Sequence, residues 1–77
     1  MIEDNQLAID MQIELTRDSI RDAKDLSELW FAAGFGEGIL VGWESAGEIS
    51  EEQRCDGIAV IQRAASFDAK VFHEVEE

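Results

Sequence analysis

Residues 7–16, LAIDMQIELT, constrain the fold of this 77-residue chain more than any other segment. Apolar and polar side chains alternate along them, because every second position from 7 to 15 carries a Leu, Ile or Met. A repeat of two residues is typical of a β-strand with one buried face, since successive side chains of a strand point to opposite sides of the sheet. The segment therefore predicts a strand.

The segment that follows has the charge pattern and the capping residues of a helix. Asp18 can cap a helix that runs on from there, whereas Asp25 with Glu28 has the spacing of a capping box. The helix therefore begins near Asp18 or at Asp25, and the sequence leaves both starts open. Its end is predicted at Gly47, because glycine suits the left-handed conformation that closes a helix.

A second helix is expected from Ser50 to about Ala65. Ser50 and Gln53 have the spacing of another capping box, and the two glutamates between them favour the positive end of a helix. Gly57 costs about 1 kcal/mol relative to Ala inside a helix, which indicates close packing against another backbone. The predicted inward stripe of this helix, widened by Ala59 and Val60, is Cys55, Ile58, Ile61 and Ala65.

Residues 69–75, AKVFHEV, alternate less cleanly, because Phe72 interrupts the pattern. A second strand is favoured there over a helical tail. The expected fold class is therefore α+β, with one small domain over residues 1–77 in the order strand, helix, helix, strand, and with residues 1–6 flexible. A two-stranded sheet leaves exposed edges, so we expect a homodimer.

Five of the six glycines lie in AAGFGEGILVGWESAG, residues 32–47. This spacing matches only the first two positions of the dinucleotide-binding motif G-x-G-x-x-G, because the third position is Ile39. Read as a helix, the segment places small residues at four-residue intervals on one face, which favours close packing. The predicted neighbour is the 51–65 helix, and contact between two copies is the alternative. The residues assigned to this helix-packing or dimer contact are Gly34, Gly38, Gly42, Trp43 and Ala46.

Eighteen acidic and six basic residues give the chain a net charge of −12. Direct binding to nucleic acids or to anionic membranes is not expected, because affinity for phosphates rests on Lys and Arg. A basic protein partner is expected instead, since opposite charge speeds the encounter. The patch with the fewest basic residues surrounds the turn between the two helices and consists of Glu44, Glu48, Glu51, Glu52 and Asp56. This patch either binds the basic partner or only keeps the protein soluble.

No group of residues indicates catalysis, so no enzyme activity, cofactor or metal is expected. His73 is the only histidine, and no cluster of His, Cys and carboxylates has the spacing of metal ligands. The single Cys55 favours a reducing, cytoplasmic setting, which would be a host cytoplasm if the chain is phage-encoded. The beginning, MIEDNQ, lacks the features of a secretion signal. The most apolar run, residues 29–43, carries Glu37 at its centre and falls short of the ~20 residues of a membrane span.

In size and acidity the chain resembles the small phage proteins that disarm host defences by occupying nucleic-acid sites, a likeness of composition that involves no motif. The resemblance implies a non-enzymatic, anti-CRISPR-like inhibitor that blocks a basic, nucleic-acid-binding partner by charge mimicry. Carboxylates one helical turn apart lie about 5–6 Å from each other, comparable to successive phosphates. The alternative is a small homodimeric structural or regulatory module that acts through an apolar surface containing Trp30, Phe31 and Trp43.

Overall fold

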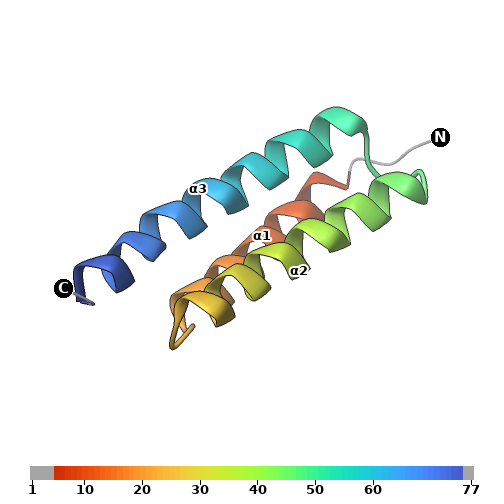
Figure 1. The fold of residues 1–77 in the computed structure, drawn as a ribbon. Coiled ribbons are helices and arrows are strands. Elements are labelled where there is room, and N and C mark those ends of the chain that lie inside the picture. Colours follow the sequence, from red (N-terminus) through yellow and green to blue (C-terminus); the bar gives the residue numbers. More distant parts are fainter. Residues whose placement is uncertain (1–4, 76–77) are drawn as a thin grey trace.

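The computed structural model describes the backbone of residues 5–75 and the side chains of residues 5–72. Within this part the chain forms three helices, α1 (Gln6–Arg21), α2 (Leu26–Ser45) and α3 (Glu51–Val75). Each helix packs against the other two in an elongated bundle of 52 × 17 × 17 Å. α1 and α3 run in the same direction, and α2 runs opposite to both (Figure 1).

The predicted α+β class is wrong, because the described residues contain no strand and the fold is all-α. Residues 7–16, the predicted first strand, lie inside α1. The buried residues of this helix follow helical rather than alternating spacing: Ile9, Thr16 and Ile20. The alternation has another cause, since three further apolar residues of α1 are exposed at four-residue intervals on the opposite side of the helix: Leu7, Met11 and Leu15.

The predicted second strand, residues 69–75, is also wrong, because these residues continue α3. Neither proline nor glycine follows Gly57 in this helix, so nothing stops it near Ala65. The buried residues of this part of the helix recur every four positions: Ile61, Ala65 and Ala69. The partly buried Phe72 extends the same stripe. Phe72, which interrupts the alternation expected of a strand, therefore fits the pattern of a helix.

The connection between α1 and α2 selects the later of the two predicted helix starts. Asp25 caps α2, and its carboxylate accepts a hydrogen bond of 2.8 Å from the backbone N–H of Glu28. The carboxylate of Glu28 in turn accepts a hydrogen bond of 3.2 Å from the backbone N–H of Lys24. Residues 18–21 complete α1 instead of opening a new helix.

The end of α2 follows the prediction at Gly47, which adopts a left-handed conformation with φ of 77°. Its N–H donates a 2.9 Å hydrogen bond to the carbonyl of Glu44. The N–H of Glu48 donates another, also of 2.9 Å, to the carbonyl of Trp43. This pair of bonds is the Schellman motif, which satisfies carbonyl groups that the helix end leaves without partners.

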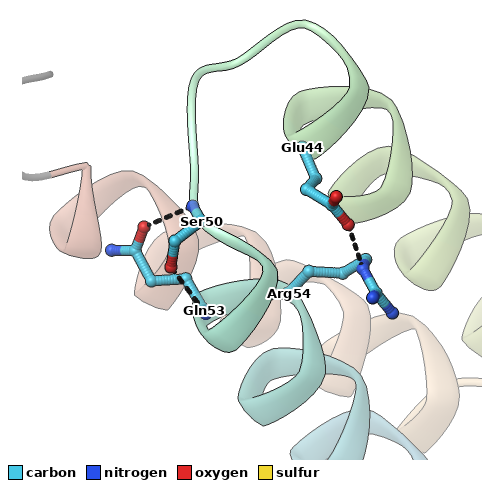
Figure 2. A network of polar contacts seen from close by, with 4 residues as sticks. All are labelled: Glu44, Ser50, Gln53 and Arg54. Atoms are coloured by element: carbon cyan, nitrogen blue, oxygen red, sulfur yellow. Dashed lines mark hydrogen bonds and ion pairs between the residues drawn. The ribbon is translucent and has the colours of Figure 1, made fainter.

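The start of α3 also confirms its prediction (Figure 2). The hydroxyl of Ser50 accepts a 3.0 Å hydrogen bond from the N–H of Gln53, and the side-chain oxygen of Gln53 accepts one of 2.9 Å from the N–H of Ser50. Both halves of the capping box are therefore formed. Of the N-terminal residues expected to be flexible, 1–4 lie outside the described part. Asn5 donates a 2.6 Å hydrogen bond to the carbonyl of Glu48, and Gln6 begins α1.

Two glycines let the helices approach each other closely. At Gly36 a Cβ atom would lie 2.6 Å from Cγ2 of Thr16, so α1 packs directly on the backbone of α2. At Gly57 a Cβ atom would lie 2.7 Å from Cδ1 of Leu40, so the packing there is close, but the predicted contact with another backbone is wrong because the neighbours are side chains. The buried apolar residues between the helices are Ile9, Ile20, Leu29, Ala33, Leu40, Ile49, Ile61, Ala65 and Ala69.

Candidate functional site

The five acidic residues assigned to partner binding lie where α2 meets α3, but one of them differs from the others. Glu44, near the end of α2, accepts a hydrogen bond from Nε of Arg54 on α3 (Figure 2). This hydrogen bond raises the pKa of Arg54 above its ordinary value. Glu44 therefore joins two helices and contributes less to a free negative surface than the sequence suggests.

The other four acidic residues remain exposed at this end of the bundle: Glu48, Glu51, Glu52 and Asp56. None of them makes an ion pair within residues 5–72. Glu51 and Glu52 lie in the first turn of α3, where negative charge interacts favourably with the helix dipole. The cluster thus stabilises the start of α3 and leaves a negative surface there.

The predicted glycine stripe lies on the outside of α2. A Cβ atom added to Gly34, Gly38 or Gly42 would meet no atom of the described residues within 4 Å, so these residues do not pack against the described part of α3. The internal-contact interpretation is therefore wrong for the three glycines, and contact between two copies stays a prediction. Trp43 is partly buried against the core, and Ala46 is exposed at the end of the helix.

An apolar surface extends over α1 and α2. The exposed fraction is 75% for Phe31, 63% for Phe35 and 61% for Leu15. The rings of Phe31 and Phe35 stack with their centroids 6.4 Å apart. Leu15 and Met11 lie side by side on α1, and Leu7 precedes them by one turn. We call this surface the apolar face and define it by five residues: Leu7, Met11, Leu15, Phe31 and Phe35.

Between α1 and α2 the apolar face is hollowed into a groove of about 430 Å³. Leu15, Phe31, Phe35 and Ile39 line it together with small or uncharged polar residues. Among residues 5–72, no charged side chain lines the groove, although 31% of the residues of the chain are charged. The groove is therefore suited to apolar contacts and not to a charged ligand.

Sequence reasoning found only part of this face. Phe31 belongs to it, whereas Trp30 is exposed outside the groove and Trp43 packs against the core. The contribution of α1 was missed because its apolar residues were assigned to a strand. The alternation itself was the available signal, since in a helix it places apolar residues on two opposite sides.

A second groove, between α1 and α3, collects three of the six basic residues of the chain: Arg17, Arg21 and Arg63. Val60 and Phe67 give it apolar walls, and Asp68 contributes one negative charge. Arg21 also lies 3.5 Å from a carboxylate oxygen of Asp18, in an exposed pair that adds little stability. Positive charge is thus concentrated on a different side of the bundle from the groove of the apolar face.

The described residues hold no group of three or more His, Cys, Asp and Glu side chains that could bind a metal ion. The backbone of His73 lies in α3 and not in a strand, and its side chain lies outside the described part. Cys55 is an exposed free thiol, so its assignment to the inward stripe of α3 is wrong. Over the described residues, no helix has the length and apolar character needed to cross a membrane.

The chain was also compared with known proteins. No family model, no curated protein and no solved structure matches it. The function therefore has to be argued from the surfaces described above.

Proposed function

We propose that this protein is a non-catalytic protein-binding module whose working surface is the apolar face. The observation that carries the proposal is the composition of α2, which is apolar on its outer side as well as its inner side. The carboxylate of each acidic residue of this helix accepts a hydrogen bond. Glu28 accepts one from the backbone N–H of Lys24. Glu37 accepts one from the side chain of Gln62, and Glu44 accepts one from the side chain of Arg54. A helix that is apolar around its circumference is typically buried, so its outer side calls for a partner.

The size of the apolar face supports this proposal. With roughly 200 Å² per large side chain, the exposed fractions of its five residues amount to on the order of 600 Å². The largest apolar patch of a typical monomer covers about 300–600 Å², and large patches often mark binding sites. Burial at about 25 cal/mol per Å² would contribute up to about 15 kcal/mol, which is enough to offset an association cost of about 4–15 kcal/mol.

A photo-crosslinking amino acid at Phe35 tests the proposal in the cell that naturally makes the protein. Benzoylphenylalanine has a similar ring and should be tolerated there, because Phe35 is exposed. We expect a crosslinked protein adduct from position 35. The matched control is position 67, since Phe67 on α3 is 71% exposed but lies outside the apolar face. Absence of an adduct at 35, or equal adducts at both positions, would contradict the proposal.

A second candidate function uses the acidic end of the bundle to block a basic, nucleic-acid-binding protein. The observation in its favour is that Glu48, Glu51, Glu52 and Asp56 are exposed and form no ion pair within residues 5–72. Such a cluster would attract a basic surface over long range and would bind less tightly at high salt.

Replacing three of these residues by Lys (Glu51→Lys, Glu52→Lys and Asp56→Lys) tests the second candidate. The control makes the same charge change at the other end of the bundle, with Asp18→Lys, Asp22→Lys and Asp68→Lys. We expect only the first set to abolish binding to a basic partner, with both sets remaining helical by circular dichroism. Equal losses from both sets would indicate an effect of net charge alone and would reject a specific acidic site.

A further inference from the structure

We propose that the apolar face is covered by a second copy of this chain, with α2 packed antiparallel on α2 and α1 on α1 across a two-fold axis. This inference rests on the proposed function and names the partner. In such a dimer the same surface of each copy forms the contact, so the surface must be complementary to itself. The uncharged lining of the groove, the pattern of large and small residues on α2, and the area of the apolar face support such a contact.

Charge restricts where two copies can meet. Each copy carries a net charge of −12, so most of its surface repels another copy. Among residues 5–72, no charged residue lines the groove between α1 and α2, so direct repulsion is absent there. On α1, Asp10 and Glu14 border Met11 and Leu15, so the contact of α1 with α1 brings like charges close to each other. An antiparallel arrangement also places the acidic turns of the two copies at opposite ends of the dimer. A parallel arrangement would place them side by side, so charge favours the antiparallel one.

The outer side of α2 is complementary to itself only in the antiparallel direction. Phe35 and Gly38 lie equally far from a midpoint between residues 36 and 37, and so do Phe31 and Gly42. A two-fold axis at this midpoint therefore places each phenylalanine of one copy over a glycine of the other. Both glycines have open space where a side chain would stand, so the rings can rest directly on the backbone.

The contact between Thr16 and Gly36 fixes which residues of α1 lie at the same level as this axis. Leu15 precedes Thr16 in the chain and lines the groove on the apolar face. Leu15 of one copy is therefore expected to meet Leu15 of the second copy close to the two-fold axis. The four stacked helices would share a core made of both apolar faces, as in a four-helix bundle.

The available area suits a dimer of modest stability. A standard interface buries about 800 Å² on each partner. This register places Leu7 opposite the α1–α2 connection of the second copy, and the other four residues of the apolar face supply on the order of 500 Å², because a large side chain exposes roughly 200 Å² when it is fully free. Ile39, Ala32, Gly38 and Gly42 are not buried and contribute further area. A second copy thus fits the surface without any further segment.

The mass of the full chain in solution tests this inference. Sedimentation equilibrium should give twice the monomer mass of 8.6 kDa. Phe35→Glu should weaken the dimer at least ~100-fold, because each dimer then buries two unpaired carboxylates. Phe67→Glu is the matched control and should leave the mass unchanged, since Phe67 is exposed away from the apolar face. Both variants should keep the helical circular dichroism of the natural chain.

A crosslink tests the register. In a Cys55→Ser background, Leu15→Cys should form a disulfide-linked dimer on mild oxidation, whereas Ser19→Cys, one turn further from the axis, should form much less. A monomeric natural chain at millimolar concentration would overturn the inference, and adducts to another protein from position 35 would then still support the proposed function. A dimer that survives Phe35→Glu would show that another surface holds it. A dimer crosslinked better through residue 19 would reject the antiparallel register.

Discussion

Gly36 and Gly38 lie two positions apart on α2, and the same substitution should have opposite effects on stability at the two sites. Gly38→Ala adds a methyl group in open space. The substitution should stabilise the monomer by up to about 1 kcal/mol, because Ala forms helix more readily than Gly. Gly36→Ala brings the same gain in propensity, but its methyl group would stand 2.6 Å from Cγ2 of Thr16. Ordinary carbon contacts lie near ~3.5–4 Å, so about 1 Å of overlap must be relieved.

Thr16 cannot turn away without loss, because its hydroxyl donates a 2.9 Å hydrogen bond to the carbonyl of Gln12. Helix α1 must therefore shift, at a cost of about 1–3 kcal/mol for an overpacked contact. Since the gain in propensity is common to both variants, this cost is also the expected difference between them. With a urea dependence near ~1 kcal/mol per M for a chain of this size, the unfolding midpoints should differ by roughly 1–3 M.

The measurement is urea unfolding followed by circular dichroism. Both variants should be made in a Phe35→Glu background, so that association does not contribute to stability. Adding Thr16→Ala to Gly36→Ala should recover part of the loss, because it removes the two atoms nearest to the new methyl group. Equal midpoints for Gly36→Ala and Gly38→Ala would refute the close contact between α1 and α2.

Three further predictions concern Gly47 and Ser50, in the connection between α2 and α3, and Cys55, near the start of α3. Gly47→Ala should cost about 1 kcal/mol or more of unfolding free energy, because Ala adopts the left-handed conformation poorly; Gly47→Asn should cost less, and thermal unfolding would show the order. Ser50→Ala should lower the stability by about 1 kcal/mol through loss of the cap to Gln53, whereas Ser50→Asp should retain most of it in the same assay. Cys55 should react with a thiol reagent in the folded protein as fast as in urea, because its side chain is exposed; strong protection of the folded protein would contradict its placement.

The helix ends could be predicted from the sequence because their signals are local. Gly47 and the pair Ser50 and Gln53 each have a chemistry that specifies one backbone geometry, and the structure has that geometry. Asp18 and Asp25 are both aspartates, a residue type that caps helix N-termini, so either could have begun the helix. Choosing between them required knowing that α1 already occupied residues up to Arg21.

The fold class could not be predicted because α1 is apolar on two sides. Its inner residues and the apolar face together produce an alternation that a strand would also produce. The glycine stripe raised a related difficulty, since spacing shows that Gly34, Gly38 and Gly42 share a side of α2 but not what that side contacts. Among glycines, only the contacts of Gly36 and Gly57 identify the internal seams.

Because α1 has two apolar sides, the helix could in principle pack against the bundle in either of two rotations about its axis. A half rotation of this helix about its axis would bury Leu7, Met11 and Leu15 and expose Ile9 and Ile20, but it would also turn Glu14 and Asp18 toward the core. Such a competing arrangement is a form of frustration. In the observed rotation the short, branched side chain of Thr16 fits against bare backbone at Gly36, where the rotated helix would present a different side chain. The fit of Thr16 to Gly36 and the cost of burying two carboxylates thus both favour the native orientation of α1 over its competitor.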